Sequence, residues 1–238
     1  MKTEIVISNL SKNYGEKQAL SDVSIHIETG MFGLLGRNGA GKTTLMRIIA
    51  TTLNKSSGSV TVCGYDISKA KEIRKLVGYL PQEFSMYPNM TVYEAMDYLG
   101  VLSELPHKMR QEKIPVLLKS VNLDDCRKVR VKALSGGMKR RLGIAQTILH
   151  DPQILIVDEP TAGLDPEERV RFRELLSEIA ENRIVILSTH IVEDIEKTCE
   201  NIAVLDKGII IFNGLLSAFI GTETSLEDAY MKKMGGLG

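Results

Sequence analysis

The distribution of apolar and polar residues predicts two kinds of β-strand in this chain. Residues 23–27 alternate between apolar and polar side chains, which is typical of a strand with one buried face. Residues 154–157 and 184–187 are unbroken apolar runs, which are typical of strands buried on both faces of a parallel sheet. The pattern therefore predicts an α/β core with a mostly parallel sheet, preceded by an antiparallel β piece that also includes residues 5–9.

The middle of the chain, from about residue 83 to 150, changes from strand to helix patterning. A Thr-x-x-Glu capping box opens a helix at Thr91 that runs to about residue 102. Residues 107–120 form a second predicted helix, which Pro115 is expected to break. A third is predicted to run from about residue 135 to 149. We therefore expect a helical subdomain inserted in the α/β core of one domain that spans the whole chain.

Shorter apolar runs, bounded by turn and capping residues, give the other elements. Asp165 and Pro166 are suited to the N-cap and first turn of a helix that ends near residue 180. Residues 12–15 are expected to form a loop with one aromatic residue, Tyr14. Further strands are predicted at 31–35, 59–63, 77–80, 202–205 and 209–212, and further helices from 42, at 69–75, at 191–199 and from about 225.

Composition and charge limit the classes of function. Hydrophobic residues make up 43% of the 238 positions, and the 30 basic residues balance the 30 acidic ones. With no global basic field, we expect no nucleic-acid partner. Three scattered cysteines suit a reducing compartment, and no signal peptide or membrane-length apolar run is evident. We therefore expect a cytoplasmic protein, which needs a partner to act across a membrane.

Residues 36–43 match the phosphate-loop pattern Gly-x-x-x-x-Gly-Lys-Thr between an apolar strand and an apolar helix. Glycines let backbone N–H groups close around an anion, and the helix N-terminus adds partial positive charge. Lys42 is suited to reach the β- and γ-phosphates, and Thr43 to offer its hydroxyl to Mg²⁺. A flexible glycine loop is the plainer alternative. The residues expected to contact the nucleotide are Gly36, Arg37, Asn38, Gly39, Ala40, Gly41, Lys42, Thr43 and Thr44.

Two carboxylates, Asp158 and Glu159, follow the buried strand at 154–157. Ligands of open α/β sheets bind at the C-terminal ends of the strands. Asp158 is therefore suited to hold Mg²⁺ beside Thr43, and Glu159 to polarise a water in line with the γ-phosphate. The alternative is that Asp158 and Glu159 are ordinary acidic residues at a strand end that turns into solvent.

A second glycine-containing segment, Ser135-Gly136-Gly137, stands at the predicted start of a helix. A hydroxyl and free N–H groups at a helix N-terminus form an anion site. The next three residues after Met138 are basic, which is unfavourable by ~0.3–1 kcal/mol each near a helix N-terminus. We therefore expect a compensating anion or an acidic partner nearby. Ser135 as a simple N-cap, with the basic residues solvated, is the alternative.

A phosphate loop, then Leu-Ser-Gly-Gly at 134–137, then Asp-Glu at 158–159 resembles the nucleotide-binding domain of ATP-binding cassette (ABC) proteins. The resemblance covers nearly the whole chain. It implies a P-loop NTPase core and a homodimer or heterodimer of ATPase subunits. ATP would then lie between the phosphate loop of one subunit and Ser135–Gly137 of the other.

The resemblance also assigns single residues. Tyr14 matches the aromatic residue that stacks on adenine, and Gln82 the glutamine that contacts Mg²⁺ and the attacking water. Asp165 matches the loop that couples the two sites, and His190 the histidine that contacts the γ-phosphate. Glu159, His190, Gln82 and Lys42 are thus the expected catalytic residues. Each also has a structural alternative: a loop aromatic for Tyr14, a solvated side chain for Gln82, a helix cap for Asp165 and a strand-end histidine for His190.

Departures from the family's commonest pattern bear on the kind of transporter. Met138 stands where the family's commonest signature has a glutamine, and methionine followed by a basic run is familiar in the exporter-like branch that includes multidrug and antibiotic exporters. Arg37 adds a positive charge beside the phosphates. The resemblance implies a separate integral-membrane permease that docks near Phe84–Met90, where methionine and aromatic residues are dense. The chain is then expected on the inner face of the cell membrane. A soluble ABC ATPase without a permease, such as the iron–sulfur assembly type, is the alternative function.

Overall fold

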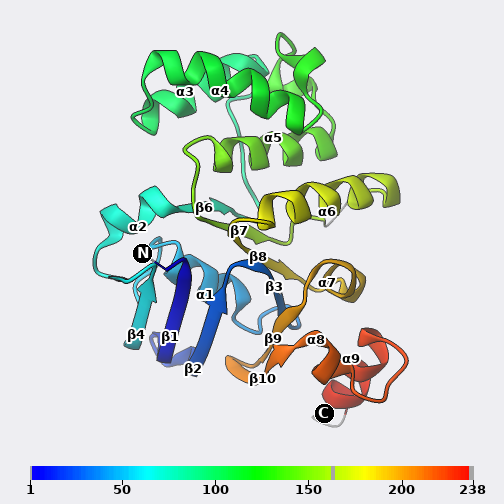
Figure 1. Ribbon diagram of the computed structural model, residues 1–238. Helices are drawn as coiled ribbons and strands as arrows, with labels where there is room; N and C mark the ends of the chain where they lie inside the picture. Colours follow the sequence, from blue (N-terminus) through cyan, green and yellow to red (C-terminus); the bar gives the residue numbers. More distant parts are fainter. Residues whose placement is uncertain (1, 162–163, 236–238) are drawn as a thin grey trace.

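A computed structural model describes residues 2–161 and 164–235 (Figure 1). The strands are β1 (Glu4–Tyr14), β2 (Lys17–Glu28), β3 (Gly30–Leu35), β4 (Ser57–Val62), β5 (Tyr65–Asp66), β6 (Val77–Leu80), β7 (Ile154–Asp158), β8 (Ile184–Thr189), β9 (Asn201–Asp206) and β10 (Ile209–Leu215). The α-helices are α1 (Lys42–Ile49), α2 (Ala70–Leu76), α3 (Val92–Leu102), α4 (His107–Ser120), α5 (Gly136–Ile148), α6 (Pro166–Ala180), α7 (Val192–Thr198), α8 (Leu216–Ile220) and α9 (Leu226–Gly235).

The predicted antiparallel β piece is a four-stranded sheet with the order β2-β1-β4-β5. The β1–β2 pairing places Ile5 opposite Ile27 and Ile7 opposite Ile25, so alternate side chains face the core. The loop predicted at residues 12–15 was wrong in part, because β1 continues to Tyr14. Tyr14 pairs with Lys17 across a tight turn. Cross-strand pairing to β2 therefore extends β1 through residues that carry too few apolar side chains to signal a strand.

The predicted parallel core is a six-stranded sheet with the order β10-β9-β3-β8-β7-β6. Strands β9, β3, β8, β7 and β6 pair in parallel, and β10 pairs antiparallel with β9 at one edge. Every residue of β7 and β8 is buried. Ile154, Ile156, Ile184 and Ile186 face the core on the side of α1 and the antiparallel sheet, whereas Leu155, Val157, Val185 and Leu187 face the core on the side of the other helices. The α/β prediction is confirmed, and the two cores explain the unbroken apolar runs.

Helices α3, α4 and α5 lie together beyond the β6 end of the sheet, at the top of Figure 1. The capping box at Thr91 is present in full. The predicted break at Pro115 was wrong, because α4 continues through this residue. Ile114 and Leu118 are both fully buried on the inner face of α4, so packing on either side of Pro115 holds the helix together.

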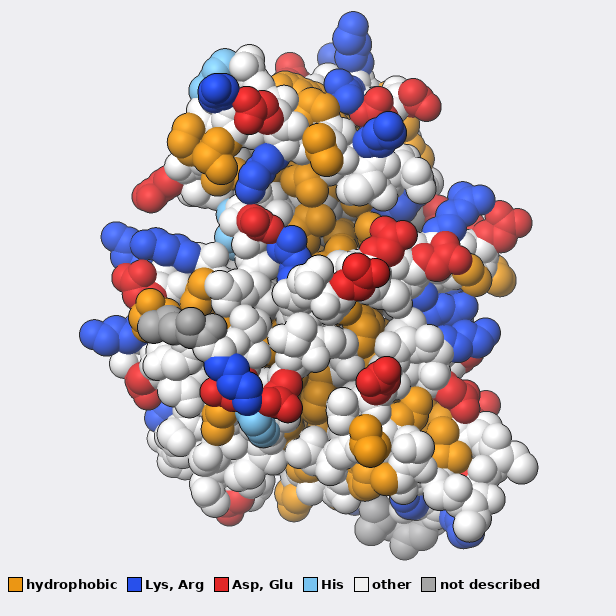
Figure 2. Space-filling model, viewed as in Figure 1, with side chains coloured by type: hydrophobic (Ala, Val, Ile, Leu, Met, Phe, Trp, Pro, Cys, Tyr) orange, Lys and Arg blue, Asp and Glu red, His pale blue; other side chains and the backbone are white. Residues whose placement is uncertain are grey.

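Helix α6 carries charged side chains on its exposed face. Figure 2 shows acidic and basic side chains interspersed over the visible face of α6. Within residues 2–161 and 164–235, the helices are all too short or too polar to cross a membrane.

Candidate nucleotide site

The phosphate loop joins β3 to α1 and is packed against the end of β9. Gly41 has a φ of 111°, which only glycine adopts without strain. A Cβ at Gly36 would stand 2.3 Å from the carbonyl oxygen of Leu205, so a side chain there would displace the loop from the sheet. Gly208 N–H donates to the carbonyl oxygen of Ala40 over 2.9 Å. The β9–β10 turn therefore braces the loop from behind.

Lys42 is held across the mouth of this loop. Its side chain is almost fully buried, and Nζ donates to the carbonyl oxygen of Gly36 over 2.6 Å and to that of Arg37 over 3.3 Å. The same ammonium lies 3.5 Å from Glu159 Oε1. Its charge is thus fixed inside the loop, where a phosphate oxygen could replace the backbone acceptors.

Asp158 and Thr43 are joined across the site. Thr43 Oγ1 donates to Asp158 Oδ2 over 2.8 Å, although 115 residues separate them in sequence. Asp158 is fully buried, and burial raises the pKa of its carboxyl group above the ordinary value. Its other oxygen, Oδ1, and the nearby buried Ser188 Oγ have no hydrogen-bond partner among the described residues. Oxygen atoms of this kind fit a divalent cation and its water ligands.

Glu159 and His190 form the contact next to this pair. β7 and β8 are neighbours in the sheet, and Asp158 lies opposite Ser188, so the residues that follow both strands meet at one edge. His190 Nδ1 lies 2.6 Å from Glu159 Oε2, and Glu159 N–H donates to the carbonyl oxygen of Ser188 over 2.8 Å. Glu159 has a φ of 49°, which is strained for a residue with a Cβ.

A cavity of about 780 Å³ opens over these groups. Among the residues expected to touch nucleotide or metal, its lining includes Tyr14, Arg37, Asn38, Gly39, Ala40, Gly41, Lys42, Thr43, Thr44, Gln82 and Glu159. Gly36, Asp158 and His190 are not part of that lining but contact Lys42, Thr43 and Glu159, which are. Tyr14 is 46% exposed with Lys12 Nζ 5.1 Å from its ring centre, so a ring face is available for stacking.

Four further residues line the cavity that the sequence patterns did not indicate: Lys17, Gln18, Ala19 and Lys207. Lys207 belongs to the Asp206-Lys207-Gly208 turn, whose pattern marks a hairpin and says nothing of a ligand. Only the packing of that turn against the phosphate loop brings Lys207 to the cavity. Residues 17–19 arrive there because β2 begins beside the loop, which no local motif encodes.

Ser135, Gly136 and Gly137 do not line this cavity. Ser135 Oγ accepts from Met138 N–H over 3.1 Å as the N-cap of α5, and Ser135 and Gly136 are exposed. Gly137 is packed so closely against Glu168 that a Cβ would stand 2.0 Å from the carboxylate. In this chain alone, the capping interpretation of Ser135 accounts for its contacts.

The basic run after Met138 finds backbone acceptors instead of an anion. Arg140 Nη1 donates to the carbonyl oxygen of Gln82 over 2.7 Å, and Arg141 Nη1 to that of Val121 over 3.3 Å. Lys139 lines a separate hollow beside Phe84. The expected compensating anion is therefore unnecessary for two of the three residues.

Asp165 caps α6, since its Oδ1 accepts from Glu168 N–H over 2.8 Å. Pro166 occupies the first turn, as the sequence predicted. The capping role is thus directly seen, and a coupling role across a dimer would be additional to it.

Comparison with known proteins identifies the same family that the motifs indicate. Residues 20–162 match the family described as ABC transporter. The linearmycin resistance ATP-binding protein LnrL of Bacillus subtilis (strain 168) is 36% identical over 221 residues, covering 92% of this chain and 69% of the relative. The Nod factor export ATP-binding protein I of Paraburkholderia xenovorans (strain LB400) is 37% identical over 226 residues, covering 94% and 74%.

The fold gives the same result. The solved structure of CbiO1 from Clostridium perfringens, described as part of the ABC transporter complex CbiONQ, superposes with a TM-score of 0.86 at 25% identity. The match covers 100% of this chain and 99% of that one. The resemblance inferred from the motifs is confirmed. The chain belongs to the ABC transporter family as an ATP-binding subunit, and it is a P-loop ATPase.

Proposed function

We propose that this chain hydrolyses ATP to drive a transporter whose membrane-spanning part is a separate permease. The observation that supports this most is the division of the phosphate-binding groups. Lys42, Thr43, Asp158, Glu159 and His190 are already connected around one cavity, whereas Ser135–Gly137 stand outside it. A second ATPase subunit would be needed to bring such a segment to the nucleotide.

The nucleotide would occupy the cavity with its triphosphate in the loop of residues 36–44 and its adenine against Tyr14. Lys42 would exchange its backbone acceptors for β- and γ-phosphate oxygens. The residues present also fit Mg²⁺, because Asp158 Oδ1 is buried and has no hydrogen-bond partner within residues 2–161 and 164–235. Thr43, Asp158 and Gln82 would hold the ion, which supplies neutralisation of phosphate charge.

Glu159 is the general base that this geometry favours. Its carboxylate is fixed by His190 on one oxygen and faces Lys42 with the other, at the edge of the cavity. A base in this position would accept a proton from a water aligned with the γ-phosphate. His190 would orient Glu159 and contact the γ-phosphate, and Gln82 would help to place the water.

Dimer closure would couple binding to movement. ATP would be enclosed between the phosphate loop of one subunit and Ser135–Gly137 of the other, since a helix N-terminus with a free hydroxyl suits the γ-phosphate. Asp165 would couple the two nucleotide sites across the dimer. The partner subunit is either a second copy or a homologous chain.

The permease would dock on the region of Phe84–Met90, within a helical subdomain over about residues 83–150 of a single-domain chain. Phe84, Met86 and Pro88 line a hollow of about 300 Å³ together with Val131, Lys132 and Lys139. Adaptable methionine and aromatic side chains suit a partner helix. The names of two relatives refer to linearmycin resistance and to Nod factor export, which favours export, with the ATPase on the inner face of the membrane.

The experiment is capture of membrane partners by the tagged chain from solubilised membranes. Met86→Asp places a charge in the proposed docking hollow, and Met231→Asp is the matched control on exposed α9. We expect the wild type and Met231→Asp to recover a multi-span protein and Met86→Asp to lose it while still binding ATP. Recovery of soluble partners only would overturn the transporter assignment and favour the soluble ABC ATPase.

A further inference from the structure

A buried charged cluster lies outside the lining of the nucleotide cavity, close in sequence to Glu159 and His190. Asp194, on α7, is fully buried. Its Oδ2 accepts from Thr161 Oγ1 over 2.5 Å, and its Oδ1 accepts from Arg173 Nη1 of α6 over 2.9 Å. Thr161 is 1% exposed and Arg173 is 8% exposed, so the three side chains form a buried network. The exposed Glu193 lies at its edge, 3.7 Å from Arg173 Nη1.

Stability alone does not account for this network. A carboxylate and a guanidinium removed from water lose hydration that their attraction only partly restores, and apolar residues of similar size often serve as well. What a network of this kind does well is to fix one relative arrangement of the elements it joins. Here it joins α6, α7 and the segment that follows β7.

The position of the network connects it with hydrolysis. Thr161 comes two residues after Glu159, and Asp194 comes four residues after His190. The bond between Thr161 and Asp194 therefore ties together the two backbone segments that carry the Glu159–His190 contact of 2.6 Å. Neither Thr161 nor Asp194 lines the nucleotide cavity, so the bond acts on these segments from outside it.

Glu159 needs support of this kind. Its φ of 49° is strained for a non-glycine residue and persists only when surrounding contacts impose it. One contact is Glu159 N–H to Ser188, on the β7 side. Along the chain on the other side, Thr161 is the next described residue whose side chain is anchored, and its anchor is Asp194.

We propose that Thr161 and Asp194 are positioning residues for ATP hydrolysis, which keep Glu159 in its strained backbone conformation against His190. Arg173 holds the Asp194 carboxylate in the orientation that receives the threonine hydroxyl. This inference rests on the role proposed above for Glu159. It makes hydrolysis depend on the Thr161–Asp194 bond, although neither residue belongs to the phosphate loop or to the cavity lining.

The test removes one hydroxyl. Thr161→Val keeps the size and branching of the side chain but cannot donate to Asp194, whereas Thr161→Ser restores the donor. We expect Thr161→Val to lower kcat at least tenfold with the Kd for ATP within twofold of wild type, and Thr161→Ser to recover most of kcat. The Kd also reports that each variant is folded.

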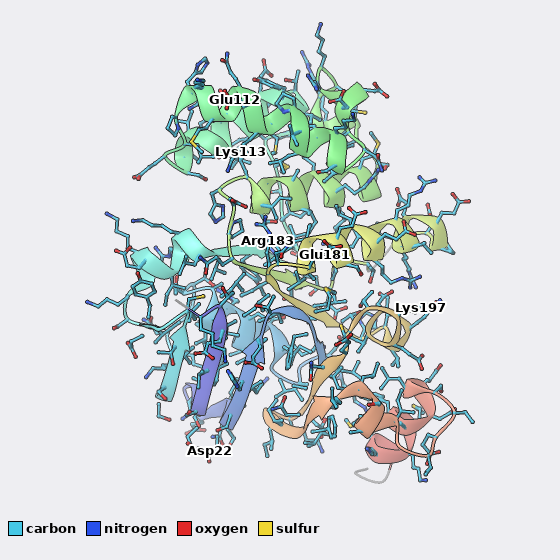
Figure 3. The ribbon with its side chains drawn as sticks, viewed as in Figure 1. Asp22, Glu112, Lys113, Glu181, Arg183 and Lys197 are labelled. Carbon is cyan, nitrogen blue, oxygen red and sulfur yellow. The ribbon has the colours of Figure 1, made fainter. Side chains whose placement is uncertain are left out.

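A matched control lies on the exposed side of α7, the helix that carries Asp194. Lys197, labelled in Figure 3, pairs with Glu193 over 2.5 Å, and Glu193 in turn lies 3.7 Å from Arg173 Nη1. Lys197→Gln therefore removes an exposed contact at the edge of the network and leaves both bonds to the Asp194 carboxylate in place. We expect its kcat to stay within twofold of wild type. Asp194→Asn should behave as Thr161→Val does, because a neutral amide no longer balances Arg173 or fixes the hydroxyl.

A double variant separates positioning from general structure. If Thr161 acts through Glu159, adding Thr161→Val to Glu159→Gln should lower the residual kcat less than twofold. A Thr161→Val enzyme with near-normal kcat, or a tenfold loss that persists in the Glu159→Gln background, would overturn the inference. Normal turnover of Glu159→Gln itself would instead overturn the proposed role of Glu159, so the two failures are distinguishable.

Discussion

The chain has two glycine-containing helix starts, at residues 36–44 and at 135–137, and they are built in opposite ways. The first is connected to its surroundings through Lys42 and Thr43, which contact backbone carbonyls and carboxylates. The second has an exposed serine whose hydroxyl accepts the capping bond from Met138 N–H. One segment is preorganised around the cavity, whereas the other meets no phosphate-binding group among the described residues. In the proposed dimer, each would be half of a nucleotide site.

The sheet explains this difference. Parallel pairing brings the C-terminal ends of β3, β7 and β8 to one edge, with Leu35 opposite Thr189 and Asp158 opposite Ser188. Charged groups that follow these strands are therefore placed by the core itself. The start of α5 lies in the helical region, where no strand end adds a second group. Dimerisation would supply what the fold leaves out.

The largest expected effect comes from removing the base of the first half-site. Glu159→Gln should lower kcat roughly 10²–10⁴-fold, because a general base is worth about that much. ATP binding should persist, since Lys42 and the loop are unchanged. Steady-state ATPase assays and nucleotide titration measure the two quantities, and size-exclusion chromatography with ATP should reveal a trapped dimer. Unchanged turnover would remove Glu159 from the mechanism.

The next effect concerns the second helix start. Ser135→Arg should abolish ATP-dependent dimerisation, because a long cation would occupy the place of the γ-phosphate of the partner's nucleotide. ATP binding to the monomer should remain within twofold. Ser177→Arg, at an exposed position of α6, serves as the control. Dimerisation of Ser135→Arg with wild-type affinity, measured by analytical ultracentrifugation, would show that the two helix starts do not meet across a dimer.

A smaller effect tests the preorganisation of the first half-site. Burial raises the pKa of Asp158, so the folded chain holds this proton at a pH where the unfolded chain has lost it. The charge therefore lowers stability as pH rises from about 4, near the unfolded pKa, through the folded pKa, and the penalty is complete above it.

Asp158→Asn should accordingly melt higher than wild type at neutral pH in EDTA, by roughly 2–4 °C for each 1 kcal/mol gained, and the difference should vanish below pH ~4. Mg²⁺-dependent hydrolysis should be lost. Scanning calorimetry measures the first effect, with Asp125→Asn at an exposed position as the control. A lower melting temperature for Asp158→Asn would mean that the hydrogen bond from Thr43 and the attraction of the Lys42 charge outweigh the cost of burying the carboxylate.

The smallest effect concerns the cavity wall that motifs do not mark. Lys207→Gln should raise the KM for ATP by about two- to fivefold, the range of a partly exposed charge contact worth up to ~1 kcal/mol. The effect should weaken in high salt, and kcat should stay the same. Lys197→Gln on α7 should leave KM unaltered. Equal KM values for all three enzymes would confine nucleotide binding to the motif residues.

Patterns along the sequence predicted what depends on neighbours in sequence. The phosphate loop, the capping box at Thr91 and the caps at Ser135 and Asp165 are local, and the structure has all of them. The doubly buried strands were also predictable, because two cores impose apolar residues on both faces. These features use backbone and capping rules that hold in any fold.

Features that depend on distant packing were missed or wrong. β1 reaches Tyr14 only because β2 pairs with it, and α4 tolerates Pro115 only because Ile114 and Leu118 are buried. Lys207 and the Thr161–Asp194 bond join segments that no local pattern relates. The motif residues of the site were therefore predictable, whereas the supporting Thr161–Asp194 bond and the cavity-lining Lys207 were not.

The strand order also has a consequence for synthesis of the chain. β3, which carries the phosphate loop, pairs with β8 and β9, whose residues lie about 150 or more positions later in the sequence, so the contacts are strongly non-local. A nascent chain leaving the ribosome therefore has its nucleotide-binding glycines long before the strands that fix them. The loop gains its final shape only when β9 and the turn at Gly208 have emerged, so nucleotide would favour the finished chain over its translation intermediates.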